Sequence, residues 1–192
     1  MTGLARSIAA GISARLNART FLPLLAVALV ATWYGLGPSL DRIVELTGRR
    51  FVDMQPGITV PELLSQLAAY TPGTAHFYIA WLAFDFAWPF VTYTAMLFMS
   101  AWLLRHAGGE WPARLWWFVG VAYTTVLMDW AENVGFGVLT AGGQSAFVAE
   151  LAVFAHRAKL GCNLVFNALF LVALVSAGLS LARRVRRRPL GC

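Results

Sequence analysis

The sequence predicts an all-α membrane protein: a four-transmembrane-helix bundle with a short extracytoplasmic helix between helices 1 and 2 and an N-terminal amphipathic helix. Hydrophobic residues make up 59% of the 192 residues and charged residues 12%, against roughly 45–50% and about 25% in soluble domains. The apolar residues also gather into four stretches, each near the roughly 20 residues that a membrane helix needs. Four helices with short loops use the whole length, so we expect a single membrane domain over residues 1–192.

Residues 1–19 predict a helix that lies on the membrane surface, because apolar residues recur there at helical spacing with arginines between them. These residues are Leu4, Ile8, Ile12 and Leu16, with Arg6, Arg15 and Arg19. A cleaved signal peptide is the other interpretation. The apolar run that follows lacks a clean small-residue cleavage site, which disfavours it.

The first membrane helix is expected over residues 20–36. Pro23 falls in its first turn, where a proline costs little, and the Gly-Leu-Gly-Pro sequence at 35–38 is expected to end it. Trp33 and Tyr34 would then lie at the far membrane interface, as aromatic belts do.

Residues 38–73 are expected to form an extracytoplasmic segment. Thr59 and Glu62 have the T-x-x-E spacing of a capping box, which predicts a short helix from about residue 60 to 70. This helix would bury Leu63, Leu64 and Leu67, and the Thr-Pro-Gly sequence at 71–73 would end it.

Three further membrane helices are expected, joined by a tight inner turn and a second outer loop. The outer loop contains Gly142-Gly143 and the polar residues His156, Arg157 and Lys159, and the histidine is expected to be solvated, like His76. The helices are expected at 75–104, 115–139 and 158–182, and a basic cytoplasmic tail follows at 183–192.

The distribution of positive charge predicts the orientation. With four helices, ten of the 15 lysines and arginines fall on one side of the membrane and five on the other. The positive-inside rule therefore places both termini in the cytoplasm of a bacterial-type inner (plasma) membrane. The net charge of +6 is explained in this way, and no nucleic-acid partner is expected. Cys162 and Cys192 would lie on opposite sides, so no disulfide is expected.

Polar residues inside the predicted helices point to one candidate site. Asp85 is expected in helix 2 and Asp129 and Glu132 in helix 3, where an ionisable side chain costs roughly 2.5–3.5 kcal/mol. Counting residues from the turns puts these acids at one level, in the outer half of the membrane. Three asparagines and a tyrosine of neighbouring turns are expected to join the acids in binding a ligand: Asn133, Asn163, Asn167 and Tyr93.

Structural roles are the alternative. The asparagines can hold helices together, and Asp129 can pair with an outer-loop arginine, namely Arg49, Arg50 or Arg157. Trp81, Trp88 and Trp130 flank the acidic level, where they either pack or surround a cation. Three buried acids must be protonated, paired with arginines or bound to a cation.

The D-x-x-E-N sequence at 129–133, together with Asp85, Pro89 and Tyr93, resembles a pattern in uncharacterised bacterial four-helix integral membrane proteins. The similarity covers about residues 58–140, including the threonine-proline-glutamate start of the short outer helix. It implies a four-helix membrane fold and no known activity.

Three functions are compatible with these features. The first is binding of a cation, or of a polar lipid or amine headgroup, by the Asp/Glu/Asn layer, and transport by so small a chain would require a homo-oligomer. The second is an accessory or structural subunit of a larger membrane complex. The third is a membrane enzyme that acts on a lipid or isoprenoid by carboxylate acid/base chemistry. Membrane lipids are the expected partners, and the sequence names no cofactor, metal or catalytic residue.

Overall fold

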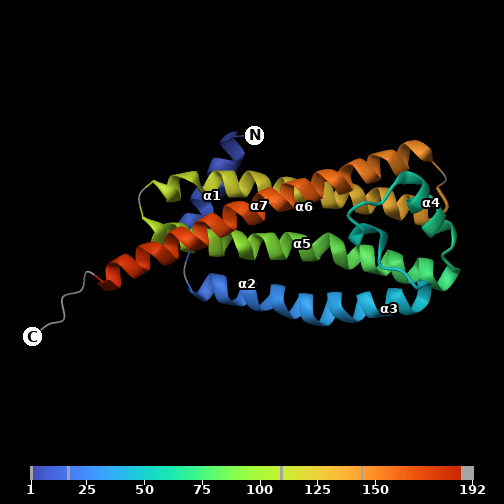
Figure 1. Cartoon of the computed structure of the whole chain (residues 1–192), viewed down its shortest axis with the longest axis horizontal. Helices are drawn as coiled ribbons and strands as arrows, with labels where there is room; N and C mark the ends of the chain where they lie inside the picture. The colour runs from blue at the N-terminus through green and yellow to red at the C-terminus, as the bar shows by residue number, and fades with distance from the viewer. Residues whose placement is uncertain (1, 17, 109, 144, 187–192) are drawn as a thin grey trace, which may run out of the picture.

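The computed structural model of this chain describes residues 2–16, 18–108, 110–143 and 145–186, and the regular secondary structure in these ranges consists of helices, without β-strands. The long helices run side by side and form an elongated bundle (Figure 1). The all-α fold class is therefore confirmed. In chain order the elements are α1 (Thr2–Arg15), α2 (Ala18–Ala31), the π-helical turn η1 (Thr32–Leu36), α3 (Gly37–Thr47), η2 (Val52–Met54), α4 (Val60–Ala68), α5 (Pro72–Ala107), η3 (Trp111–Arg114), α6 (Leu115–Thr140) and α7 (Ala146–Arg186).

Three helices in the described part of the chain are long and apolar enough to cross a membrane. They are Phe21–Thr47, Pro72–Ala107 and Ala146–Arg186, with 27, 36 and 41 residues, against the roughly 20 that a crossing needs. This finding agrees with a membrane protein. α6 has 26 residues and runs beside them. It is not among the three, because polar and charged side chains interrupt its apolar sequence.

The first long helix does not end at residue 36, as the sequence predicted, but continues through η1 and α3 to Thr47. The π-helical turn η1 contains Gly35 and is followed directly by Gly37, and the helix continues through both glycines. Gly35 is needed there, because a β-carbon at this position would lie 2.5 Å from the ring of Phe84. Pro38 falls in the first turn of α3, where a proline is tolerated. The helix ends instead at Gly48, whose φ of 67° closes the last turn.

The last helix also differs from the prediction, since α7 begins at Ala146 rather than near residue 158. The polar residues at 156–159 therefore lie within a helix and not in an outer loop. The stretch 146–160 contains no proline or glycine, and its buried residues Ala149, Ala152, Val153 and His156 follow helical spacing. Residues 187–192, which include Cys192 and part of the predicted basic tail, lie outside the described residues.

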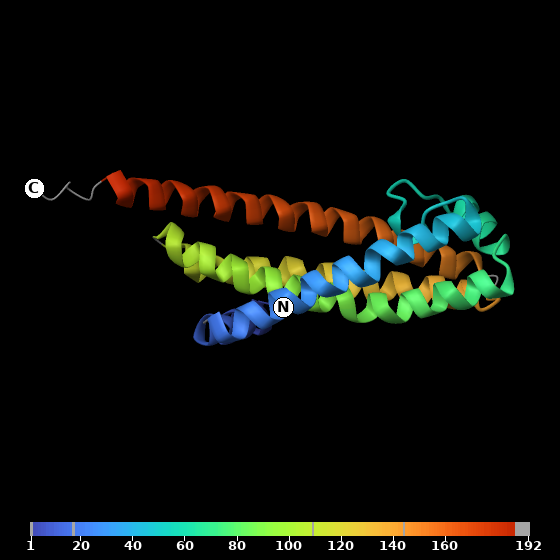
Figure 2. The same cartoon turned by 90° about the horizontal axis from the view of Figure 1, so that it is seen from below.

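The segment 48–59 and α4 fold over one end of the bundle, next to the start of α5 and the α6–α7 turn (Figures 1 and 2). We call this the capped end, and the opposite end, where α7 finishes, the arginine end. The predicted capping box is present: the Thr59 backbone N–H donates to Glu62 Oε2 at 2.9 Å. Leu63 and Leu67 are buried as predicted, and Leu64 is half-buried. The helix ends at Ala68, close to the expected position.

The N-terminal helix α1 packs against α6 and α5 in the arginine half of the bundle. Ile12 is buried there and Ile8 is partly buried, whereas Leu4 stays exposed. Arg6 lies over the ring of Trp116 at 5.3 Å from its centroid. The predicted amphipathic helix thus exists, and its apolar face contacts the bundle.

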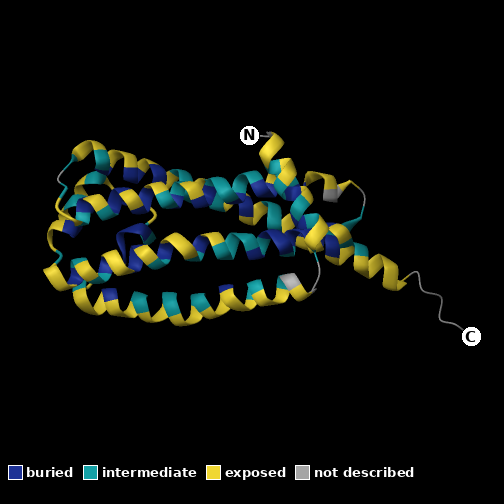
Figure 3. Ribbon diagram, turned by 180° about the vertical axis from the view of Figure 1, so that it is seen from behind, coloured by how far each residue is buried: buried dark blue, intermediate teal, exposed yellow. Residues whose placement is uncertain are grey.

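Two apolar clusters form the core, one in each half of the bundle. Leu97, Phe118 and Phe166 belong to the cluster of the arginine half, and Phe51 and Phe136 to the cluster of the capped half. The helices α2 and α3 leave most of their surface exposed (Figure 3). Between the two clusters, α5, α6 and α7 bury a set of polar side chains.

Contact between α6 and α7 depends on Gly135, because a β-carbon there would lie 2.7 Å from Cβ of Ala152. We expect Gly135→Ala to lower stability by about 1–3 kcal/mol, the usual cost of overpacking. The measurement is thermal unfolding in mild detergent.

Gly120→Ala is the matched control, because nothing lies within 4 Å of a β-carbon at that position of the same helix. It should leave stability unchanged or raise it by up to about 1 kcal/mol through better helix propensity. Equal stability of the two variants would show that the close approach at Gly135 contributes nothing.

Candidate functional site

The buried polar side chains come from four parts of the chain and form one connected group, which we call the charged layer. Asp85 lies on α5, and Asp129, Glu132 and Asn133 lie on one face of α6. Glu132 lies eight residues before the end of α6, or about 12 Å from the capped end at 1.5 Å per residue. The other members of the charged layer are Asp53 of η2 and two residues of α7, His156 and Lys159.

The Lys159 ammonium group lies between two carboxylates of α6. Its Nζ is 3.0 Å from Asp129 Oδ1 and 2.6 Å from Glu132 Oε2. The Lys159 side chain is 13% exposed and the Glu132 side chain is fully buried. This ion pair joins α6 to α7. This pair is not predicted from the sequence, because the polar residues around Lys159 indicate the end of a solvated loop. The unbroken helical pattern of 146–160 was the available signal.

His156 makes a second contact with Glu132 and ties the layer to the capped end. Its Nδ1 is 3.0 Å from Glu132 Oε1, and its Nε2 is 3.1 Å from the backbone carbonyl oxygen of Gln55. A carbonyl oxygen only accepts, so Nε2 carries a proton in this arrangement. A single proton then lies between Nδ1 and Oε1, and the two residues together are neutral wherever it resides. The prediction that His156 is a solvated loop residue is wrong.

Asn133 connects the acids of α5 and α6. Its Nδ2 donates to Asp85 Oδ2 at 3.0 Å and to Asp129 Oδ2 at 3.4 Å. Asp85 and Asn133 are 3% and 1% exposed. The sequence analysis predicted that these three residues meet at one level, and the contacts agree with that prediction.

Asp53 enters the layer from the capped end and was not predicted. Its Oδ2 accepts from the Trp81 indole N–H at 3.2 Å. Burial raises the pKa of the Asp53 carboxyl to about 6, Lys159 opposes this rise, and Glu132 adds to it. No local signal marks Asp53 as buried, because its position depends on how the 48–59 segment folds over the helices.

Several buried oxygens of the layer and its neighbourhood have no hydrogen-bond partner within the described chain. They are Asp53 Oδ1, Asn133 Oδ1 and the Tyr78 hydroxyl. Tyr78 lies two turns from Asp85 on the same face of α5, within electrostatic reach of Asp53, Asp85 and Glu132. Buried polar atoms are normally satisfied, so these oxygens mark a place that can accept a proton or a cation.

The remaining predicted site residues form a separate group, closer to the arginine end. The Tyr93 hydroxyl donates to Asn163 Oδ1 at 2.7 Å and so joins α5 to α7. Asn167 is exposed, and its Nδ2 donates to Asn163 Oδ1 at 2.8 Å. These hydrogen bonds fit the structural alternative, in which the three residues hold helices together, while the charge of Asp129 still reaches the Tyr93 hydroxyl.

The flanking tryptophans bond to the protein through their indole N–H groups. Trp88 donates to the Thr32 hydroxyl at 3.0 Å, which ties η1 to α5. Trp130 donates to the carbonyl of Phe86 at 2.8 Å, in the turn before Pro89. With Trp81 bonded to Asp53, all three favour packing and bonding over the enclosure of a cation.

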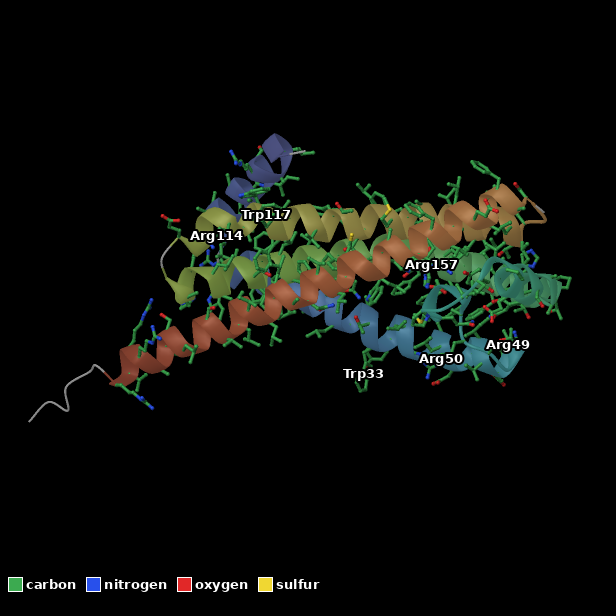
Figure 4. All side chains as sticks on the ribbon, turned by 45° about the horizontal axis from the view of Figure 1, so that its top comes forward. Trp33, Arg49, Arg50, Arg114, Trp117 and Arg157 are labelled. Atoms are coloured by element: carbon green, nitrogen blue, oxygen red, sulfur yellow. The ribbon has the colours of Figure 1, made fainter. Side chains whose placement is uncertain are left out.

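The predicted pairing of Asp129 with an outer arginine is wrong, since the ion pairs of Asp129 and Glu132 are made with Lys159 and His156. Arg49 and Arg50 lie exposed at the capped end, and Arg157 is exposed on α7 (Figure 4). Among the described residues, no group of three histidines, cysteines, aspartates or glutamates is arranged to hold a metal ion.

Comparison with protein-family models, with curated proteins and with solved structures found no match to this chain. The site must therefore be interpreted from its own charges and contacts.

The charges of the layer do not balance. His156 and Glu132 together are neutral, and Lys159 balances Asp129. Asp85 and Asp53 are then left without a counter-charge among the residues of the layer. Burying uncompensated carboxylates is costly, so the layer has two acids that favour a proton or a cation.

Removal of the lysine charge should be strongly destabilising. In Lys159→Met, Asp129 and Glu132 lose their shared counter-charge, and the expected loss of stability is about 3–5 kcal/mol. Thermal unfolding in mild detergent measures it. The double variant Lys159→Met, Asp129→Asn should recover part of this loss, because it removes the carboxylate that Lys159 balances.

Arg157→Met is the control, because Arg157 is exposed on the same helix, and it should change stability by no more than about 0.5 kcal/mol. A Lys159→Met protein as stable as wild type would show that the ion pairs contribute nothing.

Asp53→Asn should stabilise the protein in a pH-dependent way. The folded pKa of about 6 lies above the ordinary aspartate pKa of 3.8, so the folded state holds the proton more tightly, and wild-type stability falls as the pH rises between these values. Above about pH 6 the variant should be more stable by about 3 kcal/mol, and near pH 4 the two should be similar.

Unfolding curves at acidic and neutral pH test this difference. Asp41→Asn is the control, because Asp41 is exposed on α3. A gap between Asp53→Asn and wild type that widens toward low pH would contradict the burial argument.

Proposed function

We propose that this chain is a multi-pass membrane protein whose charged layer binds a cation, and that this cation is the proton. The proposed topology has four crossings, with α2–α3, α5, α6 and α7, both termini in the cytoplasm of a bacterial-type inner membrane, and the capped end outside. The excess of lysine and arginine at the arginine end and in the tail supports this orientation.

The observation that carries the proposal is the surplus of carboxyl groups in a closed layer. Among the described residues Asp85 makes no ion pair, it is almost fully buried, and it accepts a hydrogen bond from the amide of Asn133. A proton removes the negative charge at this site and needs no additional space. A larger cation or an amine headgroup would have to displace the Asn133 amide or neighbouring side chains. Titratable groups buried in membrane bundles mark ion pathways, proton relays, voltage sensors or ligand counter-ions, and the lack of space at Asp85 favours the proton among these.

The test is the infrared carbonyl band of protonated carboxyl groups, recorded on the protein in lipid at neutral pH. The wild type should show this band, Asp85→Asn should remove the part due to Asp85, and the exposed control Asp41→Asn should leave the band unchanged. Absence of the band in wild type, or an identical band in Asp85→Asn, would contradict the proposal.

Addition of sodium, potassium or methylammonium salts separates the proton from other cations. We expect neither the band nor the melting temperature to respond specifically to any of them. Loss of the Asp85 band together with a raised melting temperature on adding one salt would identify that cation as the ligand in place of the proton. If the layer neither holds a proton nor responds to salts, its role is structural, as in an accessory subunit.

A further inference from the structure

The surroundings of the charged layer differ on its two sides. Toward the arginine end, the fully buried side chains of Phe118, Phe166 and Leu97 supply apolar surface beside the hydrogen-bonded group of Tyr93, Asn163 and Asn167. At the capped end, the 48–59 segment and α4 border a cavity of about 340 Å³. The residues that line it are Arg50, Met54, Gln55, Pro56, Gly57, Ile58 and Glu62.

Gln55 links this cavity to the layer, because it lines the cavity and its backbone carbonyl accepts from His156 Nε2. Its side chain holds the segment in place: Gln55 Nε2 donates to the Arg50 carbonyl and to Gln66 Oε1, both at 2.9 Å. The Gln66 amide also donates to the Arg50 carbonyl at 2.9 Å. The carbonyl that covers the histidine is thus positioned by a small network of amides.

We propose that protons enter and leave the charged layer at the capped end through His156, and that the Gln55 carbonyl is the gate over its Nε2. This inference rests on the proposed function and adds the route by which the proton exchanges. His156 is the group of the layer whose ring contacts both the cavity-lining segment and an acid of the layer. It is a proton-transfer residue, while Gln55 and Gln66 are positioning residues.

The transfer follows the contacts of the layer. In the open state the Gln55 carbonyl has moved away and Nε2 has given its proton to the cavity water, so that the imidazole is neutral with its proton at Nδ1. A hydronium ion in the cavity then forms an N–H bond at Nε2 and is left as water. The N–H bond at Nδ1 breaks, and its proton forms an O–H bond on Glu132. Lys159 gives one ammonium proton to Asp129 and takes one from Glu132. Asp129 passes its proton to Asp85, which shares the Asn133 amide with it. One proton has then moved from the cavity to Asp85.

The charges around His156 favour this role. Glu132 and Asp129 face it from α6, Asp53 enters from η2, and Lys159 lies one turn further along α7. If His156 loses one proton, either Nε2 is left without a hydrogen and faces the Gln55 carbonyl, or Nδ1 is left without a hydrogen and faces Glu132. The second costs more, because it breaks a charge-assisted bond to a buried carboxylate. Deprotonation therefore weakens the bond to Gln55, and the gate opens toward the cavity.

The experiment measures hydrogen–deuterium exchange of the Asp85 carboxyl, seen as the downshift of its infrared band after transfer of the protein in lipid to deuterated buffer. His156→Gln keeps an amide that can donate to the Gln55 carbonyl but has no titratable group. It should slow the exchange on the order of a hundredfold, as expected for loss of a positioned acid–base group. Gln55→Ala removes the amide network and should speed the exchange several-fold.

His76→Gln is the matched control, because His76 is an exposed histidine near the start of α5, at the same end of the bundle, and it should leave the rate unchanged. An Asp85 band that exchanges at the wild-type rate in His156→Gln would overturn the route and leave the proposed function standing. Absence of any Asp85 band would instead overturn the proposed function. If His156→Gln does not fold, an unchanged rate in Gln55→Ala would overturn the route.

Discussion

The Lys159 ammonium group between Asp129 and Glu132 is the contact on which the rest of the site depends. Two carboxylates four ångströms or less from one cation on another helix fix both the spacing and the register of α6 and α7. Once Glu132 is held there, its other oxygen is available to His156, and the histidine in turn reaches the backbone of the 48–59 segment. A single charge thus organises a chain of contacts from the bundle interior to its surface.

The acids of α6 have different partners on the two sides of the helix. Toward α7, its acids meet basic groups at ion-pair distance. Toward α5, the Asn133 amide donates both to Asp129 and to Asp85, the acid of α5. The first side gives stability, and the second carries the uncompensated charge. The separation explains how a bundle can be firmly held and still contain an acid without a counter-charge in the layer.

Much of this architecture could be predicted from local patterns. The capping box at Thr59 and Glu62, the all-helical fold and the meeting of Asp85 with Asp129 and Asn133 follow from spacing alone. The missed parts depended on longer-range packing. The glycines at 35 and 37 signalled a helix end, but a π turn against Phe84 absorbed them. His156 and Lys159 are polar residues that follow a glycine pair, a pattern that predicts a loop, whereas both lie on α7, and Asp53 is buried only by a loop that folds back over the helices.

The order of the charged residues along the chain has a consequence for biosynthesis under the proposed topology. Asp85, Asp129 and Glu132 are made before Lys159, which lies on the last helix. During insertion, the hairpin of α5 and α6 would carry three carboxyls with no lysine to balance them, at roughly 2.5–3.5 kcal/mol for each. The hairpin would settle fully in the lipid only when α7 arrives. A ribosome that stalls before residue 159 would leave an intermediate that membrane quality control can recognise by its unbalanced charge.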